Sequence, residues 1–434
     1  MQVIFFNKLG YGPLWNTHFI DINRYRRKSR YFDEKRIFNF SNNFLKFIFA
    51  HISFMRKVLA FLIIISITES LQVVNGQNMV PKFIRRMYFN KDTSKHSSFI
   101  YLPILTSAPE TGIEIGGAGL YSFYTDTLHH DTRVSSIYGY ASLTTKGQNR
   151  LSLNTNYWTP GNKLHYTAYT GVINFPSDFY GIGNNTHLAD KEHVGEHRYK
   201  LTFGIEKLAA SNVYIGLVSG AVKFNFENYN LYGIFHIDPL VENRDGGEFA
   251  YIGPSFNYDT RNNNTYTTKG MIVTAYFNAM HGVLADNGYV GGFFNVEYSQ
   301  FFALNKKLVL GVDVQEQSLV GGRSPFYLLP QMGSDEMMRG YYSGRYRDRN
   351  FIAGQTELRY RINPRFGLAG FVGTGEVFHD TFSAQQLKPN YGGGIRYFFD
   401  LEKGLSVRFD YGVGQKPAGE ERESGFYVGL GQSF

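Results

Sequence analysis

The stretch Glu423 to Phe434, ESGFYVGLGQSF, decides the fold class of this chain. Successive side chains of a strand point to opposite faces of a sheet. One face therefore carries Phe426, Val428, Leu430, Gln432 and Phe434, and the other carries Tyr427, Gly429, Gly431 and Ser433. An apolar face against lipid and a small, polar face toward a lumen are typical of a transmembrane β-barrel, because lipid offers no partner to an open sheet edge.

The same alternation recurs upstream, in about sixteen segments between turn signals, each long enough to cross a bilayer as a tilted strand of about 9 to 11 residues. They lie near 98–106, 113–124, 134–144, 150–158, 163–174, 197–208, 213–224, 249–258, 269–279, 289–302, 307–316, 351–362, 365–377, 390–399, 404–413 and 424–434. The connections between them are mostly short at one end, as in TPGN (159–162), and long at the other, as in 175–196 and 317–350. The sequence therefore predicts an all-β fold, a 16-stranded antiparallel transmembrane β-barrel with its tight turns in the periplasm.

Composition and charge support a β-barrel and argue against a nucleic-acid-binding protein. The chain has 47 glycines and 17% aromatic residues, which suits strands better than helices. Its formal charge is +8, but residues 1–96 hold 16 lysines and arginines against 5 aspartates and glutamates, so residues 97–434 carry −3. A mildly acidic main body argues against a nucleic-acid partner.

The first 96 residues divide into three segments. Met55 begins MRKVLAFLIIISITESLQVVNGQ, whose basic start, short apolar run and small Gly76 predict a secretory signal peptide over 55–76. A signal peptide should begin its chain, so we interpret 1–54 as a non-native upstream extension, with a genuine basic extension as the alternative. Residues 77–96 are predicted to be a short basic periplasmic stub, and 97–434 the barrel. The absence of cysteine agrees with an exported protein that needs no disulfide.

A charged, glycine-rich stretch interrupts the strand pattern at Gly333 to Asn350, GSDEMMRGYYSGRYRDRN. It falls in the long connection between the eleventh and twelfth predicted strands. Its four arginines and three acids must meet water or polar partners, because burying an unpaired charge is costly. The sequence predicts a long loop that finds its partners inside the barrel.

Four stretches carry a resemblance to a known family. They are Thr106 to Leu120 (TSAPETGIEIGGAGL), Phe175 to Asn184 (FPSDFYGIGN), Tyr258 to Gly270 (YDTRNNNTYTTKG) and the MRGY motif, which is Met338, Arg339, Gly340 and Tyr341, followed by SGRYRD. In this order and at these strand positions, they resemble the BamA/TamA superfamily of bacterial surface antigens. The resemblance covers nearly all of 97–434. It implies that the extracellular loop folds inward and that its arginine pairs with acids of the lumen wall.

Strand parity tells which side chains form that wall. The polar face of the twelfth predicted strand contains Glu357, and the inward faces of the fourteenth and fifteenth contain Arg396, Arg408 and Asp410. We therefore expect Arg339 to pair with Glu357 first and with Asp410 second. The family's thirteenth strand usually carries an aspartate in a Phe-x-Asp pattern, where this chain has Gly373. This departure predicts a weaker loop clamp, and a purely structural role for MRGY is the alternative.

The resemblance implies outer-membrane assembly or translocation of protein or lipid, by opening of the seam between the first and last strands near Phe99 and Phe434. Segment 77–96 is too short for the POTRA domains of assembly members, so we expect a separate periplasmic accessory protein. Two alternatives stay open. One is a passive pore gated by the 333–350 loop, and the other is a structural subunit that docks a partner.

No pattern in the sequence predicts an enzyme. The chain has no Gly-x-Ser-x-Gly motif. The His193 to His197 stretch, HVGEH, matches an inverted zinc-protease spelling, but that chemistry needs a helix and this segment is predicted to be a loop. We expect no catalytic residue, cofactor or metal. We expect a monomeric barrel in contact with outer-membrane lipid, with both termini in the periplasm.

Overall fold

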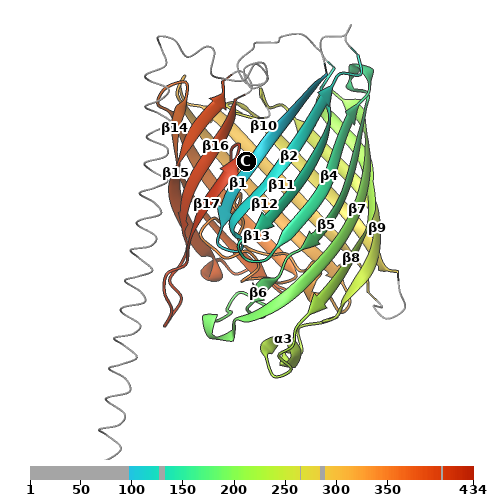
Figure 1. Cartoon of the computed structure of the whole chain (residues 1–434), viewed down its shortest axis with the longest axis vertical. Coiled ribbons are helices and arrows are strands. Elements are labelled where there is room, and N and C mark those ends of the chain that lie inside the picture. The colour runs from blue at the N-terminus through green and yellow to red at the C-terminus, as the bar shows by residue number, and fades with distance from the viewer. Residues whose placement is uncertain (1–96, 127–131, 264, 284–288, 402–403) are drawn as a thin grey trace, which may run out of the picture. The chain divides into compact units, whose positions relative to one another are not determined.

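The computed structural model describes residues 97–126, 132–263, 265–283, 289–401 and 404–434. The predicted segments 1–54, 55–76 and 77–96 lie outside these residues. The described part forms one closed antiparallel β-barrel (Figure 1), with β1 to β5 and β7 to β17 as its sixteen wall strands. Within these residues, no helix has the length and apolar character needed to cross a membrane.

The strands are β1 (Ser98–Ala108), β2 (Gly112–Phe123), β3 (Ser135–Thr144), β4 (Asn149–Trp158), β5 (Leu164–Asn174), β6 (Ser177–Phe179), β7 (Glu192–Ala210), β8 (Val213–Glu227), β9 (Gly246–Asp259), β10 (Gly270–Gly282), β11 (Val290–Ala303), β12 (Leu308–Gly321), β13 (Asn350–Arg361), β14 (Phe366–Phe378), β15 (Lys388–Asp400), β16 (Leu405–Val413) and β17 (Ser424–Leu430). A single-turn helix, α3 (Ile234–Ile237), lies in the connection between β8 and β9.

The predicted fold class and all sixteen strands are confirmed, and the three largest differences from the predicted bounds are at the ends of β7, β12 and β17. β7 begins at Glu192, five residues before the predicted position, because its first residues pair with the short strand β6. β12 continues to Gly321, where its Leu319 is buried in the barrel interior. β17 ends at Leu430, because Gly431 has a φ of +79° and turns the chain out of the strand.

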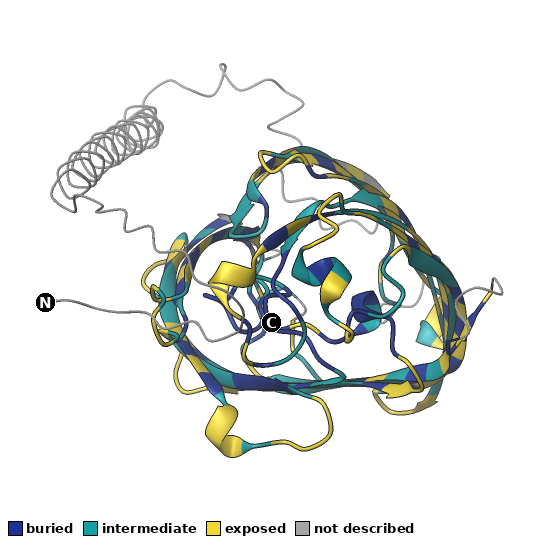
Figure 2. Cartoon of the chain, turned by 90° about the horizontal axis from the view of Figure 1, so that it is seen from below, coloured by how far each residue is buried: buried dark blue, intermediate teal, exposed yellow. Residues whose placement is uncertain are grey.

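The barrel interior is packed with side chains, not open. Seen from the end that carries the long loops, buried segments lie inside the ring of strands (Figure 2). A buried apolar cluster fills the region between β7 and β12 and includes Phe179, Phe235 and Phe326. A second cluster joins the 322–349 loop to the wall and includes Met338, Tyr341 and Tyr346. Burial of large apolar side chains here stabilises the inward position of the loop.

The barrel closes through an unequal pair of edges. β1 pairs with β2 along its whole length, from Ser98 opposite Ser122 to Ala108 opposite Gly112. On its other edge, β1 meets β17 through a single residue pair, Ser107 opposite Val428. The wall between β1 and β17 is therefore held by far fewer backbone hydrogen bonds than its neighbours, and we call it the seam.

Candidate functional site

The 322–349 loop, which joins β12 to β13, places Arg339 inside the barrel, against the inner face of β13 to β16. The Arg339 side chain is fully buried. Its Nη1 donates to Asp410 Oδ2 at 2.7 Å, and its Nη2 donates to Glu357 Oε2 at 2.8 Å. Its guanidinium also lies 3.5 Å from the centroid of the Phe371 ring, within cation–π range. The two acids stand on β13 and β16, so one loop side chain ties together well-separated strands of the wall.

Glu357 and Asp410 also bind wall arginines. Glu357 Oε1 accepts from Arg359 Nε at 2.8 Å, and Glu357 Oε2 accepts from Arg396 Nη2 at 3.5 Å and from the Ser433 hydroxyl at 3.0 Å. Asp410 accepts a short hydrogen bond from Arg396 Nη1. Both carboxylates are fully buried, so their arginine partners are what keeps them charged away from water.

The remaining arginine of this cluster, Arg408, lies 3.5 Å from Asp410 and binds the side chain and the carbonyl of Asp335. Asp335 is half-exposed. Four buried arginines thus share two fully buried carboxylates and one partly exposed carboxylate. We call these seven side chains the ion cluster: Arg339, Arg359, Arg396, Arg408, Glu357, Asp410 and Asp335. The cluster has fewer acids than bases, which makes each acid harder to replace than each arginine.

The backbone around Arg339 fits closely against β16. Gly340 has a φ of +110°, and a Cβ at that position would lie 2.8 to 2.9 Å from backbone atoms of Gly412, Val413 and Gly414. The Gly340 N–H donates to the buried Tyr427 hydroxyl at 2.8 Å. Glycine is therefore required here by both conformation and space.

Gly373 stands where the resemblance places an aspartate. A Cβ at Gly373 would lie 2.6 Å from Asn390 Oδ1, and the Asn390 amide in turn donates to the Arg339 carbonyl at 3.0 Å. Arg339 still meets two carboxylates, although its buried Nε has no hydrogen-bond partner in the described part of the chain. Asn390 thus supports the loop backbone from this side of the lumen.

The end of the chain differs from its prediction. Phe426 is 50% exposed on the lipid side of β17 and Phe99 is 61% exposed on β1, but Phe434 lies inside the barrel. Its ring centroid is 5.9 Å from that of Phe301 and 4.8 Å from the Arg359 guanidinium. Arg359 Nη2 also donates to the Phe434 main-chain oxygen at 2.7 Å. The predicted proximity of Phe99 and Phe434 at the seam is therefore wrong.

Phe434 lies in the lumen because a glycine before it takes a left-handed backbone conformation. Simple alternation carries β17 to residue 434, but Gly431 turns the chain inward, and Gly311 leaves room for the Phe434 ring at 2.9 Å from its would-be Cβ. Sequence reasoning also missed Arg359 and Ser433 as partners of Glu357. The pair of glycines in GLGQSF was the available signal for a bend.

The outer end of the loop is held by a second polar contact. Arg345 Nη2 donates to Glu420 Oε2 at 2.5 Å, and the Tyr346 hydroxyl donates to Glu423 Oε1 at 2.5 Å. Burial opposes ionisation of Glu420, but hydrogen bonds from Arg345 and from the Leu188 N–H outweigh it and lower the pKa of Glu420. The loop between β16 and β17 thus covers the 322–349 loop on its outer side.

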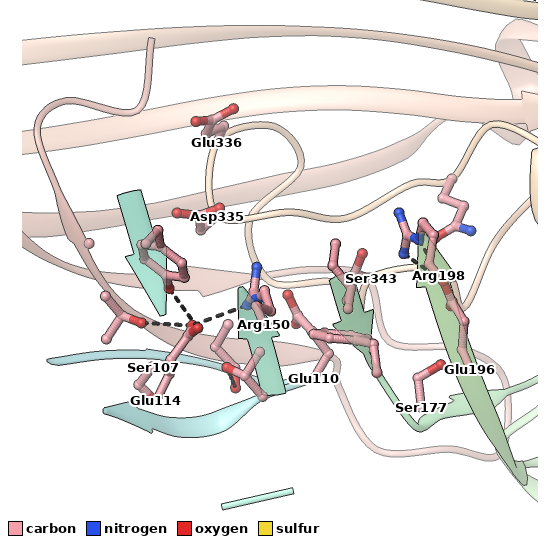
Figure 3. A pocket seen from close by; sticks show the side chains of 18 of the residues that line it. Ser107, Glu110, Glu114, Arg150, Ser177, Glu196, Arg198, Asp335, Glu336 and Ser343 are labelled. Atoms are coloured by element: carbon pink, nitrogen blue, oxygen red, sulfur yellow. Dashed lines mark hydrogen bonds and ion pairs between the residues drawn. The ribbon is translucent and has the colours of Figure 1, made fainter. Parts of the chain in front are cut away.

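A cavity of about 780 Å³ remains in the lumen beside the seam (Figure 3). Its wall includes Ser107 and Ala108 of β1 and Val428, Gly429 and Leu430 of β17. Glu114 lies at its side and accepts hydrogen bonds from four side chains, those of Thr106, Tyr140, Ser142 and Arg150. The cavity connects the polar interior with the least-paired part of the wall.

Glu110, in the hairpin between β1 and β2, lines this cavity with a carboxyl group whose ionisation changes near neutral pH. Burial and, to a lesser degree, the nearby Asp335 raise the pKa of Glu110 to about 7. A carboxyl group whose pKa is raised by folding costs stability as pH rises from its unfolded value toward its folded value. We expect Glu110→Gln to stabilise the barrel by about 1 to 3 kcal/mol at pH 8 and to have no effect at pH 4. Urea unfolding at the two pH values measures this, and an equal effect at both would contradict it.

The HVGEH stretch lies in a strand. His193, Glu196 and His197 are residues of β7, where Arg198 binds Glu196 at 2.7 Å and Asp178 lies 3.3 Å from His193. No group of three or more potential metal ligands occurs within the described ranges. In a strand the two histidines point to the same face but lie about 13 Å apart along it, too far to share one metal ion, whereas a helix would bring them together.

Comparison with known proteins adds a family. The family model described as the Omp85 superfamily domain matches residues 139–434. No curated protein matches the chain. Among solved structures, BamA from Haemophilus ducreyi lacking POTRA domains 1–3 aligns with a TM-score of 0.54 and 12% identity, over 81% of this chain and 77% of that one. CdiB from Acinetobacter baumannii aligns with a TM-score of 0.50 and 12% identity, over 77% of this chain and 59% of that one. At these identities the two structures share the fold with this chain.

Proposed function

Because the chain belongs to the Omp85 superfamily of outer-membrane β-barrels, we propose that it assembles or translocates protein or lipid at the bacterial outer membrane by opening the seam between β1 and β17. The observation that carries this proposal is the single residue pair, Ser107 opposite Val428, that closes the barrel. Lipid gives an open sheet edge no hydrogen-bond partner. A nearly unpaired edge within the membrane is costly unless another strand or chain occupies it.

The segment after β17 supports the same proposal. If the β1–β17 register continued, residues 431–434 would lie opposite residues 104–101. They instead fold into the lumen, where Ser433 binds Glu357 and Phe434 contacts Arg359. The same four residues would thus exchange their lumen partners for the β1 edge when the seam region rearranges. An element with two discrete arrangements is what a gate requires.

A cysteine lock tests the proposal. The chain has no native cysteine, so Ser107→Cys with Val428→Cys crosslinks the seam alone. We expect the oxidised lock to abolish the protein's contribution to growth and outer-membrane composition, with recovery on reduction. The matched control is Ser107→Cys with Ile113→Cys, which crosslinks the same β1 residue to its β2 partner and leaves the seam free. Normal growth and envelope composition with the seam fully locked would sink the proposal.

Three finer points belong to the same proposal. The chain enters the barrel at the start of β1 and leaves it at the end of β17, both at the short-turn end, and this end faces the periplasm. The protein acts with a separate periplasmic partner. It has no catalytic activity of its own. Quantitative mass spectrometry of material that co-purifies with the membrane-extracted protein tests the partner, and the lack of any stoichiometric companion would contradict that point.

A pore gated by the 333–350 loop is the second candidate, favoured by the lumen cavity that remains beside the loop. Deletion of 335–348 removes Arg339 and most of the loop's share of the second buried cluster, including Met338, Tyr341 and Tyr346. We expect it to raise single-channel conductance in planar bilayers severalfold, whichever function is right. The two candidates differ for a full-length loop that is crosslinked to the barrel wall through introduced cysteines. Only the pore function predicts that this crosslink lowers solute uptake by cells, so uptake measurements separate the candidates.

A further inference from the structure

Exposed lysines gather at the short-turn end of the barrel. They lie in the turns before β5, β10 and β12 and near the end of β7, and all are exposed: Lys163, Lys207, Lys269, Lys306 and Lys307. The described residues of turns 159–163, 260–269 and 304–307 include no aspartate or glutamate. We call these five lysines the basic rim. Neither the ion cluster nor the seam uses any of them.

Backbone hydrogen bonds hold two parts of the rim against neighbouring turns. The Leu208 N–H donates to the Lys163 carbonyl at 3.0 Å, and the Arg361 N–H donates to the Lys307 carbonyl at 2.7 Å. Lys163 and Lys207 are thereby held on adjacent turns. The five lysines are distributed along the short-turn end from the β4–β5 turn to the β11–β12 turn, and none lies on the seam strands β1 and β17.

The acids nearest to this surface already have partners. Asp259 accepts two hydrogen bonds from the Arg261 side chain, at 3.0 and 3.1 Å. Glu206 faces the lumen, where it lies 3.0 Å from His165 Nδ1. The rim charge is therefore not neutralised by either of these carboxylates.

Strand parity directs part of the rim toward lipid. On β7, Leu201, Phe203 and Ile205 form the exposed outer face, and Lys207 is the next residue on that face. Lys269 is exposed in the turn that leads into β10, just before Gly270. Long lysine side chains at such positions extend along apolar surface and place the ammonium group among headgroups.

Exposed aromatic residues fix the depth of the rim. Phe302, Tyr360 and Phe366 lie at the same ends of β11, β13 and β14, on the lipid side, and each is 43 to 47% exposed. Aromatic side chains mark the boundary between hydrocarbon and headgroups in membrane barrels. The lysines lie just beyond this boundary, at the depth of lipid phosphates.

We infer that the basic rim binds the phosphates of anionic phospholipids in the leaflet on the turn side, which is the inner leaflet in the proposed orientation. The opposite end has the other sign in its 228–245 loop, which holds Asp238, Glu242 and Asp245 against Arg244. Ammonium groups near a membrane surface attract anionic lipid headgroups. Lipid binding by the basic rim does not depend on opening of the seam, so an experiment can disprove one claim and leave the other standing.

The test is lipid retention measured by native mass spectrometry on the full chain, in detergent with added phosphatidylglycerol, phosphatidylethanolamine or lipid A. The variant is the triple substitution Lys207→Gln, Lys269→Gln and Lys306→Gln. The control is Lys223→Gln, which removes an exposed lysine near the opposite end of β8, where Lys223 binds Glu248. Heat-modifiable migration on gels checks that each variant is folded.

We expect the wild type to retain phosphatidylglycerol over phosphatidylethanolamine, the triple variant to lose at least about tenfold in that retention, and Lys223→Gln to keep it. If the triple variant does not fold, salt dependence of the wild type replaces it, because the Debye length falls to about 3 Å at 1 M salt and retention should fall with it. Equal retention of the two phospholipids by the wild type overturns the inference. So does unchanged retention in the folded triple variant, or loss of lipid A retention alone.

Discussion

Glu357→Gln is expected to destabilise the barrel by about 3 to 5 kcal/mol, the range for removing one partner from a buried ion pair. The Glu357 carboxylate is fully buried and binds Arg339, Arg359 and Arg396. Glutamine keeps the shape but removes the charge, which leaves Asp410 as the carboxylate for Arg339 and Arg396 and leaves Arg359 with no carboxylate side chain among the described residues. Urea unfolding followed by heat-modifiable gel migration measures the change.

A comparison with Arg339→Gln makes this prediction more specific, because the loss of stability should differ between the two substitutions. Without Arg339, Glu357 still has Arg359 and Arg396, and Asp410 still has Arg396 and Arg408. Arg339→Gln should therefore cost roughly half as much as Glu357→Gln, within about 1 to 3 kcal/mol. A larger loss for Arg339→Gln than for Glu357→Gln would contradict a cluster in which acids are the scarce partners.

Gly340→Ala is expected to expel the 322–349 loop from the lumen. The new Cβ would lie within 2.9 Å of the β16 backbone, and the φ of +110° is unfavourable for any residue with a side chain. Expulsion breaks the Arg339 ion pairs as well, so the cost should reach about 3 kcal/mol or more. Protease cleavage within 322–349 on intact cells and a rise in single-channel conductance measure it.

Gly419→Ala is the matched control for this variant. Gly419 also has a left-handed φ, +77°, and lies in the loop that covers the site, but a Cβ there meets nothing within 4 Å. It should cost only the backbone term of about 1 to 2 kcal/mol. Equal protease sensitivity of the two variants would mean that contact with β16 does not hold the loop in place.

The sequence predicted most of this fold because the strands of a barrel wall follow one local rule, the alternation of side chains between the two faces. Inward and outward faces alternate residue by residue, so Glu357, Arg396, Arg408 and Asp410 were placed in the lumen from parity alone, and all four are buried. The family resemblance, not parity, pointed to Arg339 as their partner from the loop.

Contacts that depend on three-dimensional closure were out of reach. Phe434 turns inward because one glycine takes a left-handed φ and another leaves space on a different strand. The weakness of the seam depends on how the first and last strands meet, which no alternation pattern reports. The β6 pairing with β7 depends on a loop that returns to its own strand.

Distance measurement across the seam tests the central claim most directly. Spin labels at Phe99→Cys and Phe426→Cys, both exposed on the lipid side, report the separation of β1 and β17 by pulsed electron resonance in lipid nanodiscs. Labels at Tyr199→Cys and Ile215→Cys, exposed on the fully paired β7 and β8, serve as the control. We predict a broad or two-peaked distribution across the seam that narrows when Ser107→Cys and Val428→Cys are crosslinked, and a single narrow peak for the control. A single narrow peak across the seam, unchanged by the crosslink, would contradict a barrel that works by opening there.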